Sequence, residues 1–512
     1  MHLAQGLARA AQTKPTGVST IFRNRRRTWS ETSDRIARLA GGLRKRGMQK
    51  GDRAAVLGLN SDRYFEYLFA VPAAGGVTVP LNIRLAAPEI AYILEDSGAT
   101  MLFVDAPYAP VLEHLDLRRS RLRDIVYLDD DAVPAGMIGF EDLLDAPPLT
   151  DVIAQDDDIA GIFYTGGTTG QAKGVMLTHR NLVANAANIV VAVGYNSDSV
   201  YLHAPPMFHL ADGASTLAVT MLGGVHVFIP RFEPAAVAAA IEAERVTNTI
   251  LVPTMINALA NHPDVDSRDL SSLSVVPFGA SPMPDAVLKR ATEKLPNTRW
   301  LHVYGMTEAA PLVTALEPQD ALTHSKSCGK AALMVEVRVA DLDDNEVPRG
   351  TVGELQVRGP NVMLGYWNKP EQTAAALRGG WYHSGDGAYM DEQGYVYIVD
   401  RLKDMIISGG ENIYSAEVEN AIALLDGVAD VAVIGIPDDK WGETVHAIVV
   451  PRTGRTLTAE AVIAHSRELI AHYKCPRSVE IRETPLPLSG AGKTLKTELR
   501  KPFWEGREKR VN

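Results

Sequence analysis

Cysteine is scarce in this sequence of 512 residues, which contains two, Cys328 and Cys475. They are far apart in the chain and have no nearby partners, so a disulfide scaffold and a zinc-finger arrangement are excluded. This usage fits a reducing compartment, and we expect a cytoplasmic protein.

Positive charge is also in deficit, because 51 Lys and Arg residues face 62 Asp and Glu residues and the net charge is −11. A protein that binds nucleic acid without sequence preference needs a basic surplus to neutralise phosphates. We therefore expect no nucleic-acid partner. Two local basic clusters exist, and such runs are usually solvated faces. The alternative is peripheral contact with an anionic membrane or an acidic cofactor. The clusters are Arg23, Arg25, Arg26 and Arg27, and Arg44, Lys45 and Arg46.

Long hydrophobic runs are missing as well. Residues 1–14 lack the continuous apolar core of a signal peptide. The longest uncharged stretch, Gly213–Pro230, approaches membrane-span length but contains polar residues and the pair Gly223-Gly224. A buried helix followed by a strand explains this stretch better, so the sequence predicts no transmembrane segment.

The composition that is present, 46% hydrophobic and 22% charged residues, is that of a globular protein, and the length requires two or more domains. Over the first four hundred residues, strand-like runs alternate with helical patterns. Ser30 can cap a helix whose apolar positions Ile36, Leu39, Ala40 and Leu43 share one face. This alternation predicts an α/β fold of layered, largely parallel sheets and helices, with sites at the carboxyl ends of strands. The expected strands are Ala54–Leu57, Val77–Pro80, Thr100–Val104, Ile125–Leu128, Tyr201–Ala204, Val225–Ile229, Thr249–Val252, Leu273–Pro277 and Leu301–Tyr304.

After about Asp400 the pattern changes to a small α+β unit, long enough to fold alone. The charged segment 400–404 marks the boundary, so we expect a large N-terminal domain (1–400) and a small mobile C-terminal domain (401–512). The expected elements of the small domain are helices at Ser415–Leu424 and Ala459–His472, and strands at Val428–Ile434, Ala447–Val450 and Val479–Ile481.

The strongest local motif is Tyr164–Gly174, which reads YTGGTTGQAKG and directly follows the strand-like Ala160–Phe163. Its glycines let the backbone approach an anion, its threonines supply hydroxyl donors, and Lys173 adds a positive charge. This favours triphosphate binding over a flexible surface turn. The loop is not a Walker A motif, and the similar segment Gly490–Thr494 fails that pattern because the required first glycine is Pro487.

Three further motifs are weaker when taken singly. Tyr304–Glu308 places an aromatic ring, a hydroxyl and a carboxylate on one short loop at a strand end, which suits a base, a phosphate and Mg²⁺. Trp381–Asp386 offers an Asp on a tight turn, an acceptor for ribose hydroxyls, and Arg401 follows it. Lys493 stands in a glycine-rich loop, where a lone lysine is usually only a solvated charge.

Taken together, the types, order and spacing of these motifs resemble the adenylate-forming (ANL) superfamily: acyl-CoA synthetases, peptide-synthetase adenylation domains and firefly-type luciferases. The resemblance covers nearly the whole chain and is closest to fatty-acid and aryl-acid CoA ligases. It also includes the segments Pro206–His209, Phe278–Pro282, Gly353–Gly359 and Asp400–Asn412.

The resemblance implies an AMP-forming acid–CoA ligase that uses ATP, Mg²⁺ and coenzyme A. The phosphate loop departs from the family at Gly166, where serine is usual, and at Ala172, where proline is usual. Thr307 would bond the α-phosphate, Glu308 would bind Mg²⁺, and Lys493 would stabilise the charge of the adenylation transition state. The remaining ATP- and AMP-binding residues implied are Thr165, Gly166, Gly167, Thr168, Thr169, Gly170, Lys173, Gly279, Ala280, Ser281, Tyr304, Asp386 and Arg401.

For the second half-reaction, related enzymes swing the small domain about a hinge, which the resemblance places at Lys403. The swing would withdraw Lys493 and bring up a loop whose Gly409 and Gly410 leave room for the pantetheine arm. The residues that would contact the nucleotide of CoA are Trp441, Tyr473, Lys474 and Arg477, and these could equally be ordinary surface residues.

The acid is less clearly indicated. The candidate pocket is apolar and contains no arginine, which disfavours a dicarboxylate. His209 would line it near the entrance, although it could be a satisfied core residue, and glycine at 279 would open space for a longer chain or a ring. We expect a medium- or long-chain fatty acid, with a benzoate- or cinnamate-type acid as the alternative. The pocket candidates are His209, Gly213, Met255, Phe278, Gly279, His302, Val303 and Pro311.

Three other functions stay open at this point. A stand-alone acyl-AMP ligase that loads a carrier protein is the main alternative. A luciferase-like oxidative enzyme shares the fold and the adenylation chemistry. A degenerate nucleotide-binding protein is disfavoured by the charged residues of the motifs, since Lys173, Glu308, Asp386, Arg401 and Lys493 are all present.

Overall fold

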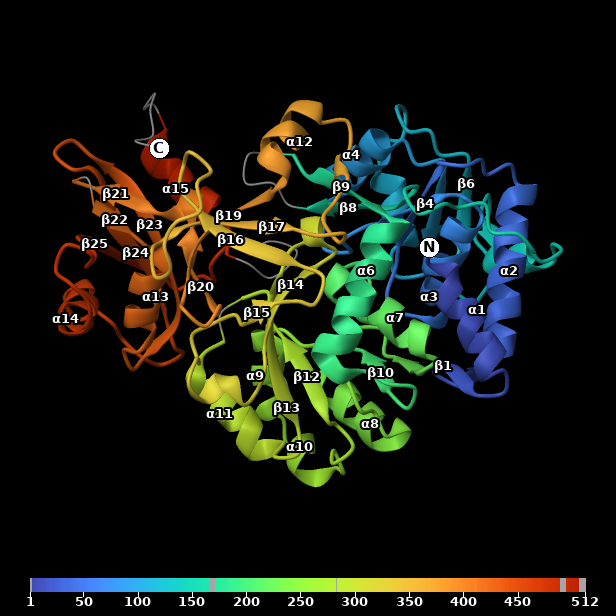
Figure 1. Cartoon of the computed structure of the whole chain (residues 1–512), viewed down its shortest axis with the longest axis horizontal. Coiled ribbons are helices and arrows are strands. Elements are labelled where there is room, and N and C mark those ends of the chain that lie inside the picture. The colour runs from blue at the N-terminus through green and yellow to red at the C-terminus, as the bar shows by residue number, and fades with distance from the viewer. Residues whose placement is uncertain (1, 166–170, 282, 410, 489–493, 506–512) are drawn as a thin grey trace. The chain divides into compact units, whose positions relative to one another are not determined.

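The computed structural model describes residues 2–165, 171–281, 283–409, 411–488 and 494–505. The chain divides into two compact units, which Figure 1 shows in colours running along the sequence. Unit 1 comprises Met1–Val337 and Val357–Tyr382, and unit 2 comprises Arg338–Gln356 and His383–Asn512. The predicted fold class is confirmed: helices and sheets alternate in a large N-terminal part, and a smaller α+β part follows it.

The largest sheet of unit 1, within the described residues, has the strand order β18-β9-β8-β4-β3-β5-β6-β7. Strands β3 to β7 are mutually parallel, whereas β8 and β9 form an antiparallel pair. Strands β4 and β5 are buried along their whole length, as expected for parallel strands covered on both faces. The bounds are β3 Arg53–Leu57, β4 Val77–Pro80, β5 Met101–Val104, β6 Asp124–Tyr127, β7 Ile138–Gly139, β8 Ile159–Thr165, β9 Lys173–Thr178 and β18 Gly365–Tyr366.

Two further sheets of unit 1 have the orders β10-β11-β1-β2 and β12-β13-β14-β15. Single bridges through Asn248 join them, from Tyr201 on one side to Val275 on the other. The predicted strand Thr249–Val252 is wrong in extent, because this segment contributes isolated bridges rather than a strand. The bounds are β1 Val18–Phe22, β2 Arg25–Thr28, β10 Val200–His203, β11 Val225–Phe228, β12 Val275–Phe278, β13 Arg299–Gly305, β14 Leu312–Leu316 and β15 Lys330–Ala331.

Helix α2 (Trp29–Lys45) shows how the helices of unit 1 are specified. Its predicted apolar face is confirmed, since Ile36, Leu39, Ala40 and Leu43 are all buried. The predicted cap is wrong: Thr28, not Ser30, accepts from the Glu31 amide in a capping box. The other helices are α1 Ala4–Thr13, α3 Asp62–Ala73, α4 Ala87–Ser97, α5 Phe140–Leu144, α6 His179–Ile189, α7 Leu210–Leu222, α8 Pro234–Glu244, α9 Pro253–Ala260, α10 Asp264–Ser267, α11 Asp285–Lys294 and α12 Pro370–Ala376.

The uncharged stretch Gly213–Pro230 forms most of helix α7 and then strand β11, as predicted. Gly223 ends the helix in the left-handed conformation, with φ of 71°. Helix α7 packs beside α6 and α1, which is visible in Figure 1. No helix among the described residues is both long and apolar enough to cross a bilayer.

The sheet β16-β17-β19-β20, in which β19 and β20 are antiparallel, lies mostly in unit 2. The second sheet of unit 2 has the order β22-β21-β24-β23, with β25 added beside β24. The small-domain elements predicted from the sequence are present, with β23 and β24 longer than expected. Bounds are β16 Glu336–Ala340, β17 Gly353–Arg358, β19 Tyr382–Met390, β20 Val396–Arg401, β21 Ile406–Ser408, β22 Glu411–Ile413, β23 Val428–Asp438, β24 Gly442–Pro451, β25 Ser478–Ile481, α13 Ser415–Ala423, α14 Ala459–Leu469 and α15 Lys496–Trp504.

The first basic cluster is ion-paired within the protein. Arg25 and Arg27 both bind the carboxylate of Asp62, whose side chain is 1% exposed, and Arg26 pairs with Glu244. Burial of Asp62 in the core requires such partners. The interpretation of this cluster as a plain solvated face is therefore wrong for Arg25 and Arg27, whereas Arg26 is exposed and fits it.

Candidate active site

The predicted phosphate loop joins two paired strands. Thr165, the last residue of β8, lies directly opposite Lys173, the first residue of β9, in an antiparallel hairpin. The sequence predicted the strand before the loop and missed the one after it. Both ends of the loop are thereby fixed by a buried sheet. The residues between them that carry the motif, Gly166, Gly167, Thr168, Thr169 and Gly170, lie outside the described residues.

Strand β18 extends this hairpin and brings a tyrosine to the start of β9. Tyr366 pairs with Val175 in the sheet, and the Lys173 Nζ lies 5.1 Å from the centre of the Tyr366 ring. The Tyr366 hydroxyl donates to Glu308 Oε1 over 3.0 Å. Tyr366 therefore holds the loop lysine on its ring face and the predicted metal ligand on its hydroxyl.

The turn that carries Thr307 and Glu308 is fixed by buried amides. The Asn361 Nδ2 donates to the carbonyls of Ala309 (2.7 Å) and Leu312 (3.1 Å), and the Leu312 amide donates to Asn185 Oδ1 over 2.9 Å. A side chain at Gly305 would place its Cβ 1.9 Å from the Pro311 carbonyl oxygen, so only glycine fits there. Tyr304 precedes this glycine in β13, so the motif begins where the strand ends.

Two tyrosines, Tyr366 and Tyr382, lie near Glu308, and their phenol groups are protonated. Burial is the main cause of the raised pKa of Tyr366 and Tyr382, and the negative charge of Glu308 adds to it in both. At neutral pH, Tyr366 is accordingly a hydrogen-bond donor to the carboxylate. Sequence reasoning missed Tyr366 altogether and left Tyr382 without a role, although Tyr382 lies inside the motif Trp381–Asp386.

The loop after β12 carries Gly279, Ala280 and Ser281. Ala280 adopts a left-handed conformation with φ of 68°, which is unusual for a residue with a side chain and typical of functional loops. A Cβ at Gly279 would lie 2.1 Å from the carbonyl oxygen of Val303. Close packing of the two backbones thus requires glycine at position 279. This reason differs from the one given by the sequence, which was that glycine opens space in the acyl pocket.

Some of the predicted acyl-pocket residues meet in the structure. Phe278 and His302, neighbours in the parallel pair β12–β13, stack with ring centres 5.2 Å apart. Burial lowers the pKa of His302, and its Nδ1 bonds the Ser327 carbonyl over 3.0 Å, so the ring is neutral and Nδ1 is the donor. Of the other candidates, Gly213 lies in α7, Met255 in α9, and Pro311 beside the Glu308 turn.

His209 stands at the N-cap of α7, with its ring 4.3 Å from that of Phe208. The His209 carbonyl accepts the amides of Asp212 and Gly213, which form the first turn of the helix. The side chain is thus attached to the end of a buried helix rather than to an open loop.

In unit 2, the predicted ribose pair is formed. Asp386 in β19 lies opposite Arg401 in β20, and Arg401 Nε contacts Asp386 Oδ1 over 2.9 Å. The carboxylate is buried, whereas the arginine is about half exposed. The two residues that the sequence assigned to one role therefore lie side by side.

The predicted hinge residue Lys403 lies in a short 3-10 helix, Leu402–Asp404. Burial is the main cause that lowers its pKa to about 8, and the charges of Arg401 and Arg500 add to this, against the opposite effect of Asp404. Arg500 bonds the Lys403 carbonyl over 3.2 Å and the Asp404 carboxylate over 2.9 Å. Helix α15 is thereby tied to this segment.

Among the predicted CoA residues, Gly409, Trp441 and Arg477 lie together. The Gly409 amide donates to the Trp441 carbonyl, and its φ of 63° and the Trp441 ring leave no room for a side chain. The Arg477 guanidinium lies 4.8 Å from the Trp441 ring centre. Lys474 instead pairs with Glu417 over 2.7 Å and lies near the ring of Tyr473. Gly410 and Lys493 lie outside the described residues.

One group in the described part of unit 2 has the composition of a metal site. Asp344, Glu354 and His383 bring their ligand atoms within 4.8 Å of one another. His383 Nδ1 bonds Glu354 Oε2 over 2.6 Å, and Gln356 Nε2 bonds Asp344 Oδ1 over 2.8 Å. These hydrogen bonds link β17 to β19 and explain why the three side chains lie together.

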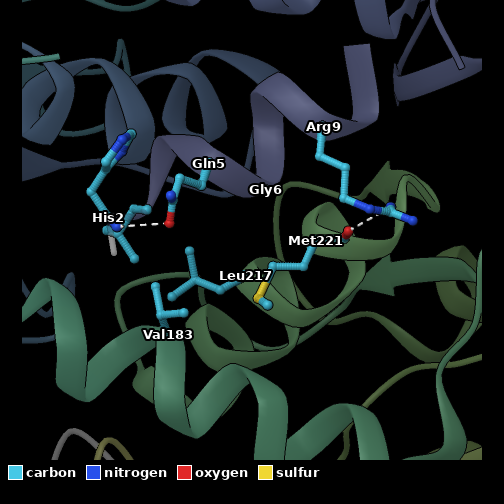
Figure 2. Close-up of a pocket in the computed structure, with 8 residues that line it drawn as sticks. His2, Gln5, Gly6, Arg9, Val183, Leu217 and Met221 are labelled. Carbon is cyan, nitrogen blue, oxygen red and sulfur yellow. Dashed lines mark hydrogen bonds between the residues drawn. The ribbon is translucent and has the colours of Figure 1, made fainter. Parts of the chain in front are cut away.

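A small cavity of about 140 Å³ lies between α1, α6 and α7, and Figure 2 shows its lining. Arg9 is turned to the Met221 carbonyl and bonds it over 3.0 Å, and the lining is mainly apolar. The cavity is lined by His2, Leu3, Gln5, Gly6, Arg9, Val183, Leu217 and Met221. None of these is a residue predicted for ATP, CoA or the acid.

Comparison with known proteins assigns both parts of the chain. Residues 7–367 match the family model of AMP-binding enzymes, and residues 417–493 match the model of the AMP-binding enzyme C-terminal domain. Feruloyl-CoA synthase of an Amycolatopsis species is 44% identical over 97% of this chain and 98% of its own. Indoleacetate–CoA ligase of Aromatoleum aromaticum is 35% identical over 98% of each chain. The structure of a Mycobacterium tuberculosis fatty acyl CoA synthetase superimposes with a TM-score of 0.79 and 32% identity, over 98% of each chain.

Proposed function

Since the chain belongs to the family of AMP-binding enzymes and is an AMP-forming acid–thiol ligase, we propose that it acts on an aryl acid of the cinnamate type. The observation that carries this proposal is the 44% identity to feruloyl-CoA synthase along nearly the whole chain. Indoleacetate is also an aromatic acid, and a ligase for it is 35% identical. Phe278 and His302, two of the predicted pocket residues, are aromatic and stack on each other, and aromatic side chains pack favourably against an aromatic substrate.

The first half-reaction joins the acid to AMP. A carboxylate oxygen attacks the α-phosphorus of ATP, the bond to the β-phosphate oxygen breaks, and pyrophosphate leaves with the electron pair. In our proposal Thr165, Lys173 and the glycine-threonine loop hold the β- and γ-phosphates, Thr307 bonds the α-phosphate, and Lys493 stabilises the charge that develops there. Such a single contact lowers the barrier by about 3–4 kcal/mol.

Mg²⁺ belongs to this proposal through Glu308. A carboxylate is a hard oxygen ligand of the kind that Mg²⁺ prefers, and the Tyr366 hydroxyl holds this one in a fixed orientation. The ion, when bound, would offset the charge of the triphosphate. Tyr304 and the Gly279–Ser281 loop would hold the adenine, and Asp386 with Arg401 the ribose.

In the second half-reaction the CoA thiolate attacks the acyl carbon, and AMP leaves. We assign the approach of CoA to Gly409 and Gly410 with Trp441 and Arg477, because the ring and guanidinium meet beside the tight Gly409 backbone. Lys403 is the proposed hinge between the two half-reactions. Tyr473 and Lys474 would contribute to the nucleotide of CoA only if the Lys474–Glu417 pair opens.

A medium- or long-chain fatty acid is the second candidate substrate, as the sequence favoured. Its support is the TM-score of 0.79 to a fatty acyl CoA synthetase and the apolar composition of the predicted pocket. A carrier protein in place of CoA is the main alternative acceptor.

The test is pyrophosphate release from Mg-ATP, with and without CoA, across cinnamic, benzoic, indoleacetic and C8–C16 fatty acids. We expect many turnovers with cinnamic acids only when CoA is present. A preference for fatty acids would replace the aryl proposal by the second candidate. A single burst that CoA does not change would point to a carrier protein.

A further inference from the structure

The side chain of Asn60 holds the main chain of a segment far away in the sequence. Asn60 lies between β3 and α3, is 2% exposed, and its own amide donates to the Pro230 carbonyl. Its Nδ2 donates to the carbonyls of His203 (3.1 Å) and Pro205 (2.8 Å). Its Oδ1 accepts from the Met207 amide over 2.8 Å. Three alternate residues of one segment are thus bound by a single buried amide.

The segment bound in this way leads directly to His209. It leaves β10 at His203, and the His209 amide donates to the Pro206 carbonyl over 3.1 Å. His209 is then the N-cap of α7. The position of this side chain therefore depends on a connection whose carbonyls and amide are fixed by Asn60.

A buried hydrogen-bonded chain fixes the first turn of α7, which directly follows His209. Asp212, in the first turn of α7, accepts from the Tyr201 hydroxyl (2.9 Å) and bonds His203 Nδ1 (2.8 Å). His203 Nε2 bonds His226 Nδ1 over 3.0 Å, and His226 Nε2 bonds Thr220 Oγ1 over 3.1 Å. These side chains are at most 1% exposed, and each finds partners, so the chain ties β10, β11 and α7 to one geometry.

We propose that Asn60 is a positioning residue for acid binding: it fixes the connection between β10 and α7 and thereby the place of His209. The inference rests on the proposed acid-ligase function and on the role that the resemblance implies for His209, which would line the acyl pocket. Asn60 acts through the main chain of the segment it binds. Its removal leaves two buried carbonyls and one buried amide without partners, so the segment shifts to regain them.

The chain offers a matched control in Asn361. This residue is also fully buried and also donates its Nδ2 to two main-chain carbonyls, those of Ala309 and Leu312. It holds the Glu308 turn, which we assign to ATP. The two asparagines should consequently affect different substrates.

The experiment compares Asn60→Ala and Asn361→Ala in the full-length protein by steady-state kinetics with the preferred acid. For Asn60→Ala we expect the KM of the acid to rise about tenfold or more, with the KM of ATP within about twofold of wild type. For Asn361→Ala we expect the larger change in the KM of ATP. Equal changes in both constants, or a lower melting temperature with unchanged KM values, would make Asn60 a purely structural residue.

Two additions keep the test decisive. Asn60→Asp keeps the acceptor for the Met207 amide and loses the two donors, so if Asn60→Ala does not fold, the rise in the KM of the acid is expected in Asn60→Asp instead. Hydrogen–deuterium exchange of residues 203–213 should quicken in the Asn60 variants and not in Asn361→Ala. Pyrophosphate release by the wild type decides the proposed function separately. Exchange in residues 203–213 of an Asn60 variant that is as slow as in the wild type would overturn the inference, whichever acid the enzyme accepts.

Discussion

At the scale of single residues, Tyr366 connects the two charged motifs of unit 1. Its ring lies under Lys173 and its hydroxyl bonds Glu308, while burial and the Glu308 charge keep the phenol protonated by raising its pKa. Partners that orient a metal ligand affect the affinity of the site for the metal. The contribution of this hydroxyl can be separated from that of the ring.

Tyr366→Phe removes the hydroxyl and keeps the ring beneath Lys173. We expect the Mg²⁺ concentration for half-maximal pyrophosphate release to rise about tenfold, with little change in the KM of the acid. Tyr127→Phe is the control, because its hydroxyl also bonds a carboxylate, Asp131, but from β6 near the opposite end of the same sheet. An unchanged Mg²⁺ requirement in Tyr366→Phe would count against the assigned role of Glu308.

Asp105 gives a pH-dependent prediction. Burial is the main cause that raises the pKa of Asp105 from 3.8 to about 6. The hydrogen bond that the carboxylate accepts from the Leu59 amide lowers this pKa, and the negative charge of Asp129 raises it. The folded state therefore binds more protons than the unfolded state between about pH 4 and 6. The stability from this group is complete below pH 3.8 and is lost as the pH rises through 6.

Asp105→Asn removes this titration and keeps an acceptor for the Leu59 amide. At pH 7.5 we expect the free energy of unfolding of the variant to exceed that of the wild type by about 1–2 kcal/mol, so the variant should melt at a higher temperature. The difference should shrink as the pH is lowered to 4.5. Thermal melts of both proteins across this range measure it, and a difference that stays constant with pH would disprove the assignment.

At the scale of elements, strands with buried apolar runs were predictable and their pairing partners were not. Val77–Pro80 is a strand with the predicted bounds, because its β-branched residues are buried along the parallel sheet. The Thr249–Val252 run has a similar composition but makes only isolated bridges. Its neighbours in space, β10 and β12, decide this, and they are distant in the sequence.

Gly279, the glycine after β12, has two competing explanations: close packing against the Val303 backbone, and open space in the acyl pocket. In Gly279→Ala the new Cβ would meet the Val303 carbonyl oxygen, so we expect a loss of about 1–3 kcal/mol in stability. Gly213→Ala is the control, because its Cβ would meet only Leu210 at 3.8 Å and alanine favours a helix. If Gly279→Ala keeps its melting temperature and only rejects larger acids, the pocket interpretation is the right one.

At the scale of the whole molecule, the two compact units do not coincide with the two domains predicted from the sequence. Residues 338–356 and 383–400 belong to unit 2, whereas the sequence placed them in an N-terminal domain that ends at 400. Asp386 and Arg401, predicted on either side of that boundary, lie in one unit. The hinge at Lys403 stays a prediction about movement between two half-reactions.

Two substitutions should separate those half-reactions. Lys493→Ala should cripple acyl-adenylate formation, by about 10²–10³ in rate, and spare the conversion of supplied acyl-AMP with CoA. Lys403→Pro restricts the backbone at the predicted hinge and should do the reverse. Pyrophosphate release and thioester formation, measured separately, give the comparison. Equal losses in both steps for either variant would refute its assigned role.

The sequence alone indicated the class of chemistry, because the loop Tyr164–Gly174 and the motifs at 304–308 and 381–386, weak when taken singly, together resemble those of adenylate-forming enzymes in type, order and spacing. It also determined most strands and helices, since burial leaves a period in the local sequence. Only the tertiary structure decided what holds these motifs in place. Glu308 is oriented by Tyr366, 58 positions further on, and the Met207 amide by Asn60, 147 positions before it. The physical reason is that hydrogen-bond partners of buried polar groups are chosen by proximity in space, which no local pattern of residues records.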